Sequence, residues 1–568
     1  MPRLATRRPS RSVLALLVSA GLASLAHADL PAILDRAPQG ATAILAAPSF
    51  NKLDSGAAGL LGVLGQAPNG LKAAMEMLGL AQTVDMTRPV AVLVMPLGDP
   101  NAAADAPPII ALLPVNDFQA MAKALDATDP GAAMPEISLQ GETFYAKPVE
   151  GGYAALSPLK DLLEKFDGAG GNLAAHAAAL GQAGERVASK GDVFIMFDPA
   201  AVQEMSKAGL NPLAGALQKP LMAAGLGGAM GQQGGMPGAK LMQDAVGGVI
   251  ALHNAPAGLH VELAMNYKPG SERASMLEAG GSSASLLNKL PSEPFLIAYA
   301  ADLSTPGMKK LIEHVGGKDP AAAASQPLLA LGAAVEGQAV AIYPNPAGLF
   351  GGLLARSVSY YAAKNPADFT HAFKTFVTGL NGQQADNNQV VSSYTDGAVA
   401  EANLKADAYS LKVLSSGGGG SPLALFYGPA SGPNGHVAAA EKGVYVTTVA
   451  DAKLMSKALA TTSDASLGSN KQLAQVASNL PANRAGELYI GVGPILTQAL
   501  PLMAMAGMNA NFTPADDLSP VGMAFIPEGG GFSVDVFVPN DVLQAVQALG
   551  AAMQQGAPQG GQPKKPAF

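Results

Sequence analysis

The sequence predicts an α+β protein with two tandem related halves, each a mainly antiparallel sheet with helices packed on one face. Three observations predict this class. Short segments that alternate apolar and polar residues are joined by Gly/Pro turns, which favours hairpins over parallel units with crossover helices. Single amphipathic helices follow single strands. The order of elements in the first part of the chain recurs in the second part, which indicates a duplication.

Composition limits the class of protein. A chain of 568 residues is longer than one hydrophobic core usually accommodates, so we expect more than one domain. Of its residues, 49% are apolar, which provides enough apolar surface for the chain to fold. The net charge of -8 argues against a nucleic-acid partner, because phosphate backbones require a basic surface. The chain contains no cysteine, which excludes disulfides, thiolate metal sites and a cysteine nucleophile.

Residues 1–28 have the pattern of a secretory signal peptide. An arginine-rich start is followed by a 13-residue apolar stretch, 13–25, and by the small-residue cleavage pattern "AHA" at 26–28. That stretch is shorter than the roughly 20 apolar residues that cross a bilayer. We therefore expect cleavage before Asp29, a periplasmic or secreted protein, and no transmembrane segment after cleavage.

The duplication is clearest in two similar segments, "GDVFIMFDP" at 191–199 and "GELYIGVGP" at 486–494. Each follows a strand that runs directly into a helix, and each precedes an alternating apolar hairpin. In the first segment, residues 193–197 are apolar on both faces, so we expect a strand in the middle of a sheet. The duplication predicts that 486–494 is the equivalent central strand. The halves then span 29–270 and 285–550.

The spacing between equivalent residues locates an insertion. Tyr153 and Tyr445 are 292 residues apart and Gly191 and Gly486 are 295 apart, whereas Gly248 and Gly522 are 274 apart. The extra length in the first half falls around 225–240, a Gly/Ala/Met-rich segment whose composition tolerates insertion. We expect this segment to be a poorly ordered excursion.

The remaining elements follow from local patterns. Short apolar runs predict strands at 88–96, 107–115 and 142–149, and 117–127 is expected to be helical. In the next helix, Ser157 is a candidate N-cap with Pro158 at the first helical position. Residues 271–284 are predicted to be a linker between the halves. The low-complexity residues 551–568 are predicted to be a disordered tail.

The repeated unit resembles a group of known sequences. An "LP" strand, a "G-x-Y" strand leading into a helix, and a "G-[DE]-x-[FY]-I" strand are similar to uncharacterised bacterial exported proteins that are classified only as domains of unknown function. The resemblance covers most of the chain after the signal pattern. It implies no activity and no functional residues.

The sequence contains no catalytic motif that its neighbouring residues support. "SPLK" at 157–160 matches the S-x-x-K pattern of serine enzymes, but the partner motifs are absent and helix capping explains it better. The seven histidines include no H-E-x-x-H motif and no pair at i and i+4. His253 and His260 flank one turn, where hydrogen bonding is favoured over metal ligation. We assign no catalytic residue, no metal and no cofactor.

Methionines gather at equivalent places in both halves, between the central strand and the final hairpin. Ordinary packing of Ala/Met-rich helices explains them, and two functional interpretations stay open: a mobile lid over a groove for lipid or an apolar partner segment, and capture of Cu(I) by thioethers. We also expect 495–508 to form an apolar helix bordering any groove. The candidate ligand-binding residues are Met230, Met236, Met242, Met503, Met505 and Met508.

These observations favour an exported, non-catalytic binding or envelope-associated scaffold protein. Its expected partner is an apolar ligand such as a lipid, or another envelope protein. The alternative is a periplasmic hydrolase whose site assembles from residues distant in the sequence.

Overall fold

The computed structural model describes most of the chain. It covers residues 30–63, 71–96, 108–139, 141–207, 242–278, 280–310, 325–352, 354–385, 388–399, 404–415, 423–505, 512–515 and 517–556. Within these ranges, no helix combines the length and the apolar character needed to cross a bilayer. The predicted signal peptide, the predicted excursion at 225–240 and residues 557–568 of the predicted tail lie outside the described residues.

The strands form a 20-stranded sheet in which each paired ladder of named strands is antiparallel. This confirms the α+β class and the antiparallel sheet. Alternating apolar runs joined by tight turns pair most readily with their neighbours in sequence, as β8 and β9 do around the turn between Ala255 and Gly258.

One side of the sheet uses strands from the first part of the chain. From the outer edge inward, the order is β4 (Glu136–Leu139), β5 (Glu142–Val149), β6 (Tyr153–Ser157), β3 (Ile109–Pro114), β2 (Val90–Val94), β1 (Ala43–Ala47), β7 (Val193–Phe197), β8 (Ala245–Ala255) and β9 (Gly258–Tyr267).

The other side begins at β20, which pairs with β9 from Gly258 opposite Pro539 to Asn266 opposite Gly531. The order outward is β20 (Gly531–Pro539), β19 (Val521–Glu528), β18 (Gly486–Ile490), β10 (Ile297–Asp302), β11 (Gly337–Ile342), β12 (Ser357–Ala362), β17 (Gly443–Thr447), β16 (Asn434–Ala440), β15 (Ala406–Ser415), β14 (Asn388–Val399) and β13 (Gln384–Ala385).

Helices pack on both faces of the sheet, so the prediction of helices on one face is wrong. Along β6, Tyr153 and Ala155 face one cluster, which includes helix α6, while Ala154 and Leu156 face another, which includes α4. All five residues of β6 are buried, and a strand that is apolar on both faces needs cover on both. Helix α15 covers one face of the outer strands β16 and β17 and α13 the other, while α16 packs on β19 and β20.

The helical elements have the following bounds. The α-helices are α2 (Phe50–Val63), α3 (Leu71–Met77), α4 (Phe118–Ala124), α5 (Lys160–Lys165), α6 (Leu173–Lys190), α7 (Pro199–Lys207), α10 (Glu272–Met276), α12 (Ser325–Ala334), α13 (Pro366–Gly379), α14 (Ala424–Tyr427), α15 (Ala452–Leu459), α16 (Lys471–Asn479), α17 (Val492–Met505) and α18 (Asn540–Gly556); the 3₁₀ turns are η1 (Ala32–Arg36), η2 (Leu286–Lys289), η3 (Gly348–Gly351), η4 (Gly428–Ala430), η5 (Ser463–Ala465) and η6 (Leu467–Ser469).

Three local predictions need correction. Helix α5 begins at Lys160, so Ser157 is not its N-cap and Pro158 is not its first residue; the Ser157 hydroxyl instead accepts a hydrogen bond from the Leu159 amide. The predicted linker contains α10, which Ser271 caps and which buries Ala274. The predicted disordered tail begins too early, because α18 continues through residues 551–556.

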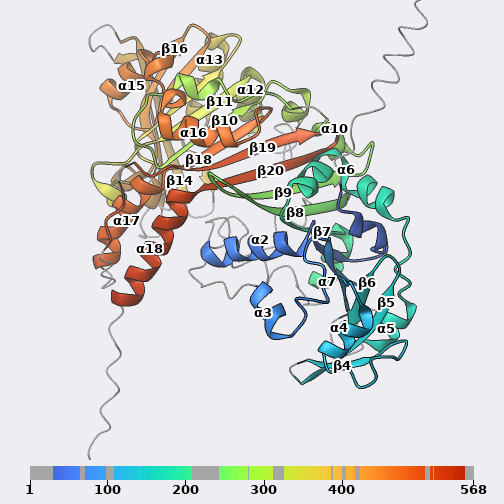
Figure 1. Cartoon of the computed structure of the whole chain (residues 1–568). Helices are drawn as coiled ribbons and strands as arrows, with labels where there is room; N and C mark the ends of the chain where they lie inside the picture. The colour runs from blue at the N-terminus through green and yellow to red at the C-terminus, as the bar shows by residue number, and fades with distance from the viewer. Residues whose placement is uncertain are drawn as a thin grey trace, which may run out of the picture.

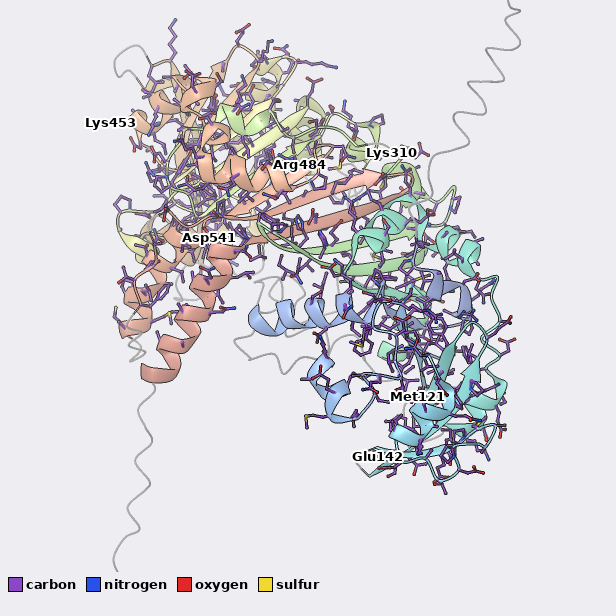
Figure 2. The ribbon with its side chains drawn as sticks, viewed as in Figure 1. Met121, Glu142, Lys310, Lys453, Arg484 and Asp541 are labelled. Carbon is purple, nitrogen blue, oxygen red and sulfur yellow. The ribbon has the colours of Figure 1, made fainter. Side chains whose placement is uncertain are left out.

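Four long strands, β8, β9, β20 and β19, cross the middle of the molecule and connect its two ends (Figure 1). Lys453 and Glu142 lie at these opposite ends (Figure 2). Helix α6 lies over one part of these strands, where it packs on β8 and β9. This central region joins the first and second parts of the chain and is the place where a shared site can form.

Candidate functional site at the central strands

The two faces of the central strands differ in chemistry. Side chains alternate between the faces, so residues directly opposite one another on neighbouring strands share a face. On one face, Glu262 of β9 lies opposite Asp535 of β20, and His260 lies opposite Phe537. Glu262, Asp535 and His260 are 4%, 3% and 8% exposed. Ionisable groups this deeply buried normally have a polar or charged partner. Here His260 pairs with Asp535, and Glu262 pairs with Arg186.

A histidine and carboxylate pair joins β9 to β20. The Nδ1 atom of His260 lies 2.9 Å from Oδ1 of Asp535. The His260 ring packs against Phe537, with ring centroids 4.7 Å apart, and lies 6.0 Å from the ring of His253 on β8. The predicted hydrogen-bonding role is therefore confirmed for His260.

The polar chain continues from His253 toward α2. Nδ1 of His253 lies 3.6 Å from Oδ2 of Asp192, the residue that precedes β7. Oδ2 of Asp192 accepts a hydrogen bond from the amide of Asn254 at 2.8 Å, and its Oδ1 lies 2.6 Å from Nζ of Lys52. The Asp192 side chain is only 4% exposed, whereas that of Lys52 is 53% exposed, so the chain of polar groups runs from the surface to the interior.

Arg186 links the first part of the chain to the second. It projects from α6, and its guanidinium lies 3.5 Å from Oε2 of Glu262 and 3.3 Å from Oε2 of Glu528. Its Nη2 donates to the Ser533 hydroxyl at 2.6 Å. Glu528 and Ser533 belong to β19 and β20, so one helix residue ties together strands that are far apart in sequence. We call this set of linked polar residues the seam network; it consists of Lys52, Arg186, Asp192, His253, His260, Glu262, Glu528, Ser533 and Asp535.

Burial dominates the electrostatics of the seam network. Desolvation raises the pKa of Glu262 above its ordinary value, and the neighbouring carboxylate of Asp535 raises it further; Arg186 acts in the opposite direction. The environment of Glu262 therefore disfavours its charged form, which suits a group held by structure rather than one exposed to substrate.

A second buried ion pair lies on β18. Nε of Arg484 donates to Oε2 of Glu487 at 2.6 Å, and the Tyr489 hydroxyl donates to the same oxygen at 2.8 Å. Burial, followed by the charge of Glu487, raises the pKa of Tyr489. Asp192 precedes Val193 as Glu487 precedes Leu488, so each of the two similar segments carries a buried, ion-paired acid at the same place.

The opposite face of the central strands is apolar. Its side chains form two rows of cross-strand neighbours between β7 and β18. In the second row Val193 and Val536 are buried, and the other side chains of both rows are only partly buried. Six strands at their usual spacing make the rows about 24 Å long. We call the partly buried members of these rows the apolar face: Ile195, Ile250, Leu252, Val261, Leu263, Val534, Phe525, Met523 and Leu488.

The structure places some of the predicted methionines beside the apolar face. Met242 packs against the cluster that includes Phe525 and Val534 at one end of the face. Met503 and Met505 lie on α17, where Met503 is half-buried and Met505 is 76% exposed. At the start of α17, Ile495 packs against the buried cluster of Leu296, Val340 and Ile342. Met230, Met236 and Met508 lie outside the described residues.

Apart from Asp192, His253 and His260, the residues of the seam network belong to no sequence motif. Their sequence signal is a period of two within apolar strands: His260 and Glu262 in one strand, Ser533 and Asp535 in the other. Polar residues on one face of a strand that is otherwise buried indicate partners across the sheet. The sequence could not identify those partners.

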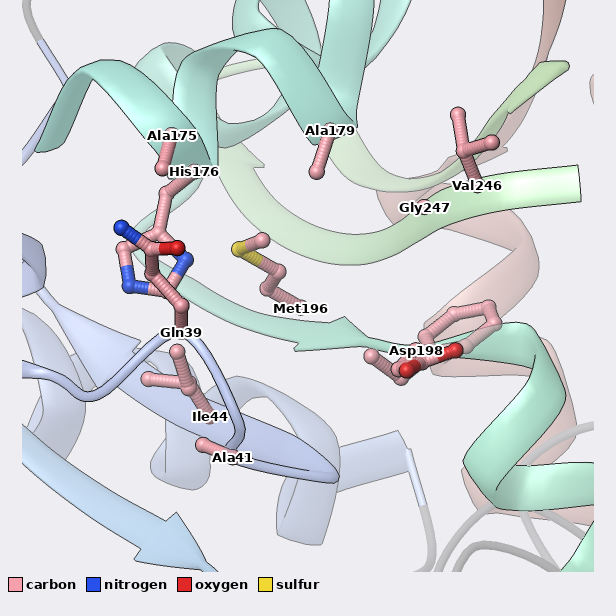
Figure 3. Close-up of a pocket in the computed structure, with 11 residues that line it drawn as sticks. Gln39, Ala41, Ile44, Ala175, His176, Ala179, Met196, Asp198, Val246 and Gly247 are labelled. Atoms are coloured by element: carbon pink, nitrogen blue, oxygen red, sulfur yellow. The ribbon is translucent and has the colours of Figure 1, made fainter. Parts of the chain in front are cut away.

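Two pockets lie away from the seam network. One, of about 210 Å³, opens between α6 and the ends of β1, β7 and β8 (Figure 3). The other, of about 430 Å³, lies at the start of α18 and is lined by polar side chains that include Lys471, Asp517 and Asp541. His260 and Asp535 line neither. Among the residues that the structure describes, no three His, Asp or Glu side chains gather as a metal site.

Comparison with protein-family models, curated proteins and solved structures finds no match.

Proposed function

We propose that this chain is an exported, non-catalytic binding protein that holds an apolar ligand, or an apolar segment of another envelope protein, against its apolar face. The observation that carries the proposal is the set of partly exposed apolar side chains that lie on neighbouring central strands around the buried Val536. An antiparallel sheet face that meets only water normally carries polar residues. Contiguous exposed apolar surface typically marks a binding site.

The free energy available from burying the apolar face is large enough to support binding. Burial of apolar surface contributes about 25 cal/mol per Å², so covering a few hundred Å² at this face yields several kcal/mol. No charged residue interrupts the two rows, since the carboxylates and histidines of the same strands lie on the other face. A neutral apolar group is therefore the expected occupant.

We infer further that the chain consists of two tandem related halves. Strand β7 lies between β1 and β8, as β18 lies between β10 and β19. The final hairpin of each half then meets the other at β9 and β20. In this arrangement the apolar face is shared by both halves, and the seam network on the reverse face keeps it rigid.

The direct test is binding of a neutral apolar dye, N-phenyl-1-naphthylamine, to the full chain purified without detergent. We expect saturable fluorescence enhancement that falls in the double variant Ile250→Gln with Leu263→Gln. The matched control is Leu414→Gln on β15, which is 47% exposed and lies outside the apolar face. Equal dye binding by all three proteins would contradict the proposal.

The hydrolase alternative is favoured by one observation, the hydrogen bond between His260 and Asp535, because hydrolases orient a histidine base in this way. Against it, the pair is buried and lies away from both pockets. Hydrolysis of a chromogenic ester by the wild-type chain, and its loss in His260→Gln, would overturn the non-catalytic proposal.

Export has its own test. We expect protein secreted by a bacterial host to begin at Asp29, because cleavage follows the small-residue pattern at 26–28. N-terminal sequencing measures this directly. A chain that retains Met1 in the cell extract would contradict export.

A further inference from the structure

The 210 Å³ pocket beside α6 is chemically distinct from the apolar face. Four side chains with lone pairs line it: Gln39, His176, Met196 and Asp198. His176 is 4% exposed and Met196 is 7% exposed, so both are held within the protein rather than on its surface. Figure 3 shows Gln39 against the His176 ring, with the Met196 side chain pointing toward them from β7.

The hydrogen bonding of His176 determines which of its nitrogens is available. Its Nε2 lies 2.9 Å from the backbone oxygen of Ala37. A carbonyl oxygen can only accept, so Nε2 carries the proton, and Nδ1 of the neutral ring keeps its lone pair. Among the described residues Nδ1 has no hydrogen-bond partner, and it is not sealed from solvent. It therefore opens onto the pocket that the ring lines.

This is the usual arrangement of a metal-binding histidine. Such residues donate one ring N–H to a backbone carbonyl or carboxylate, which fixes the tautomer and the orientation of the ring, and bind metal through the other nitrogen. The Ala37 carbonyl supplies this support here.

The neighbouring groups select the type of metal. Met196 offers a thioether, a soft ligand, and the amide of Gln39 donates to Asn172 at 3.4 Å, which leaves its oxygen available. Asp198 also lines the pocket, but its Oδ1 already accepts from the amides of Ala200 and Ala201. Neutral nitrogen and thioether ligands suit a soft monovalent ion better than Zn²⁺ or Ca²⁺.

We propose that His176 and Met196 bind one Cu(I) ion in this pocket, with Gln39 beside it. The site is independent of the apolar face and of the proposed function, because it lies at the ends of β1 and β7 and shares no residue with that face. It is formed by the first part of the chain alone.

The test is competition for Cu(I) between the full chain and a chromogenic Cu(I) chelator, under anaerobic reducing conditions. Met196→Leu removes the sulfur with little change of volume. We expect the wild type to bind one tight equivalent and Met196→Leu to bind at least about tenfold more weakly. His176→Gln, which can still donate to Ala37, should weaken binding similarly. Copper X-ray absorption should show sulfur and nitrogen ligands in the wild type.

The matched control is Met75→Leu, because Met75 is also 7% exposed but lies on α3, outside the pocket. Thermal unfolding of each variant verifies that the fold is retained. Wild-type affinity in Met196→Leu, an equal loss in Met75→Leu, or no tight equivalent in the wild type would each overturn the proposal. An organic molecule in the pocket of the purified protein would do so as well.

Discussion

At the scale of single residues, Glu262 sets a pH dependence. Its folded pKa is raised, chiefly by burial and then by Asp535, so the native state disfavours the charged carboxylate. Stability from this residue is therefore greatest at low pH, where the group is neutral in both states, and is lost as pH rises through the folded pKa. Glu262→Gln should be more stable than the wild type at pH 8, and this advantage should shrink toward pH 4.

Urea unfolding between pH 4 and pH 8 measures this difference. The variant keeps the shape of the side chain, and Arg186 retains Glu528 and Ser533 as partners. A difference that is independent of pH, or a loss of stability at pH 8, would contradict the argument.

Replacing Arg484 should destabilise the protein, because it leaves the buried carboxylate of Glu487 without its ion-pair partner. The side chain of Arg484 is 8% exposed and that of Glu487 is 1% exposed. Arg484→Met should therefore cost about 3 to 5 kcal/mol, since an unpaired carboxylate stays buried. The matched control is Lys364→Met: Lys364 pairs with Glu336, the two side chains are 82% and 36% exposed, and the loss should stay below about 1 kcal/mol. Comparable losses in the two variants, measured by denaturant unfolding, would show that burial does not govern these pairs.

At the scale of elements, the contact between α6 and β8 depends on a glycine. A Cβ added at Gly247 would meet the backbone carbonyl of Ala179 in α6, a group that cannot move independently of its helix. Gly247→Ala should therefore cost about 1 to 3 kcal/mol by overpacking. Gly550 in α18 is the control, because no described atom lies within 4 Å of a Cβ added there. Gly550→Ala should stabilise α18 by roughly 0.5 to 1 kcal/mol. Thermal unfolding distinguishes the two, and the same sign for both would contradict this packing.

Elements also show where local patterns are reliable. The helix predicted at 117–127 is α4, which begins after Asp117, and the Asp117 side chain accepts from the Ala120 amide as an N-cap should. The serine predicted to cap the next helix instead ends a strand, because β6 continues through Ser157 to complete its pairing with β5. Tertiary pairing outweighs the small free energy of one cap.

At the scale of the whole molecule, the seam network predicts cooperative unfolding. Arg186 binds Glu262 of β9 and Glu528 of β19, so its loss leaves two carboxylates without their common partner. We expect one calorimetric transition in the wild type, and a lower midpoint or two transitions in Arg186→Met. Lys374→Met is the control, because its pair with Asp396 is 41% and 68% exposed. Two separate transitions in the wild type would show that the seam does not couple the parts of the chain.

The sequence by itself determined the α+β class, the antiparallel hairpins and the strand within the segment 191–199, which spans Val193–Phe197. These features depend on hydrophobic period and turn residues, which act over a few positions. Only the tertiary structure decided that β9 pairs with β20, that Glu262 meets Asp535, and that helices cover both faces. A period of two in the sequence does not say which face of a strand a helix will cover. Strands that pair across hundreds of residues also leave no pattern within either strand that identifies the partner. Their pairing is selected by the packing and charge compensation of the complete sheet.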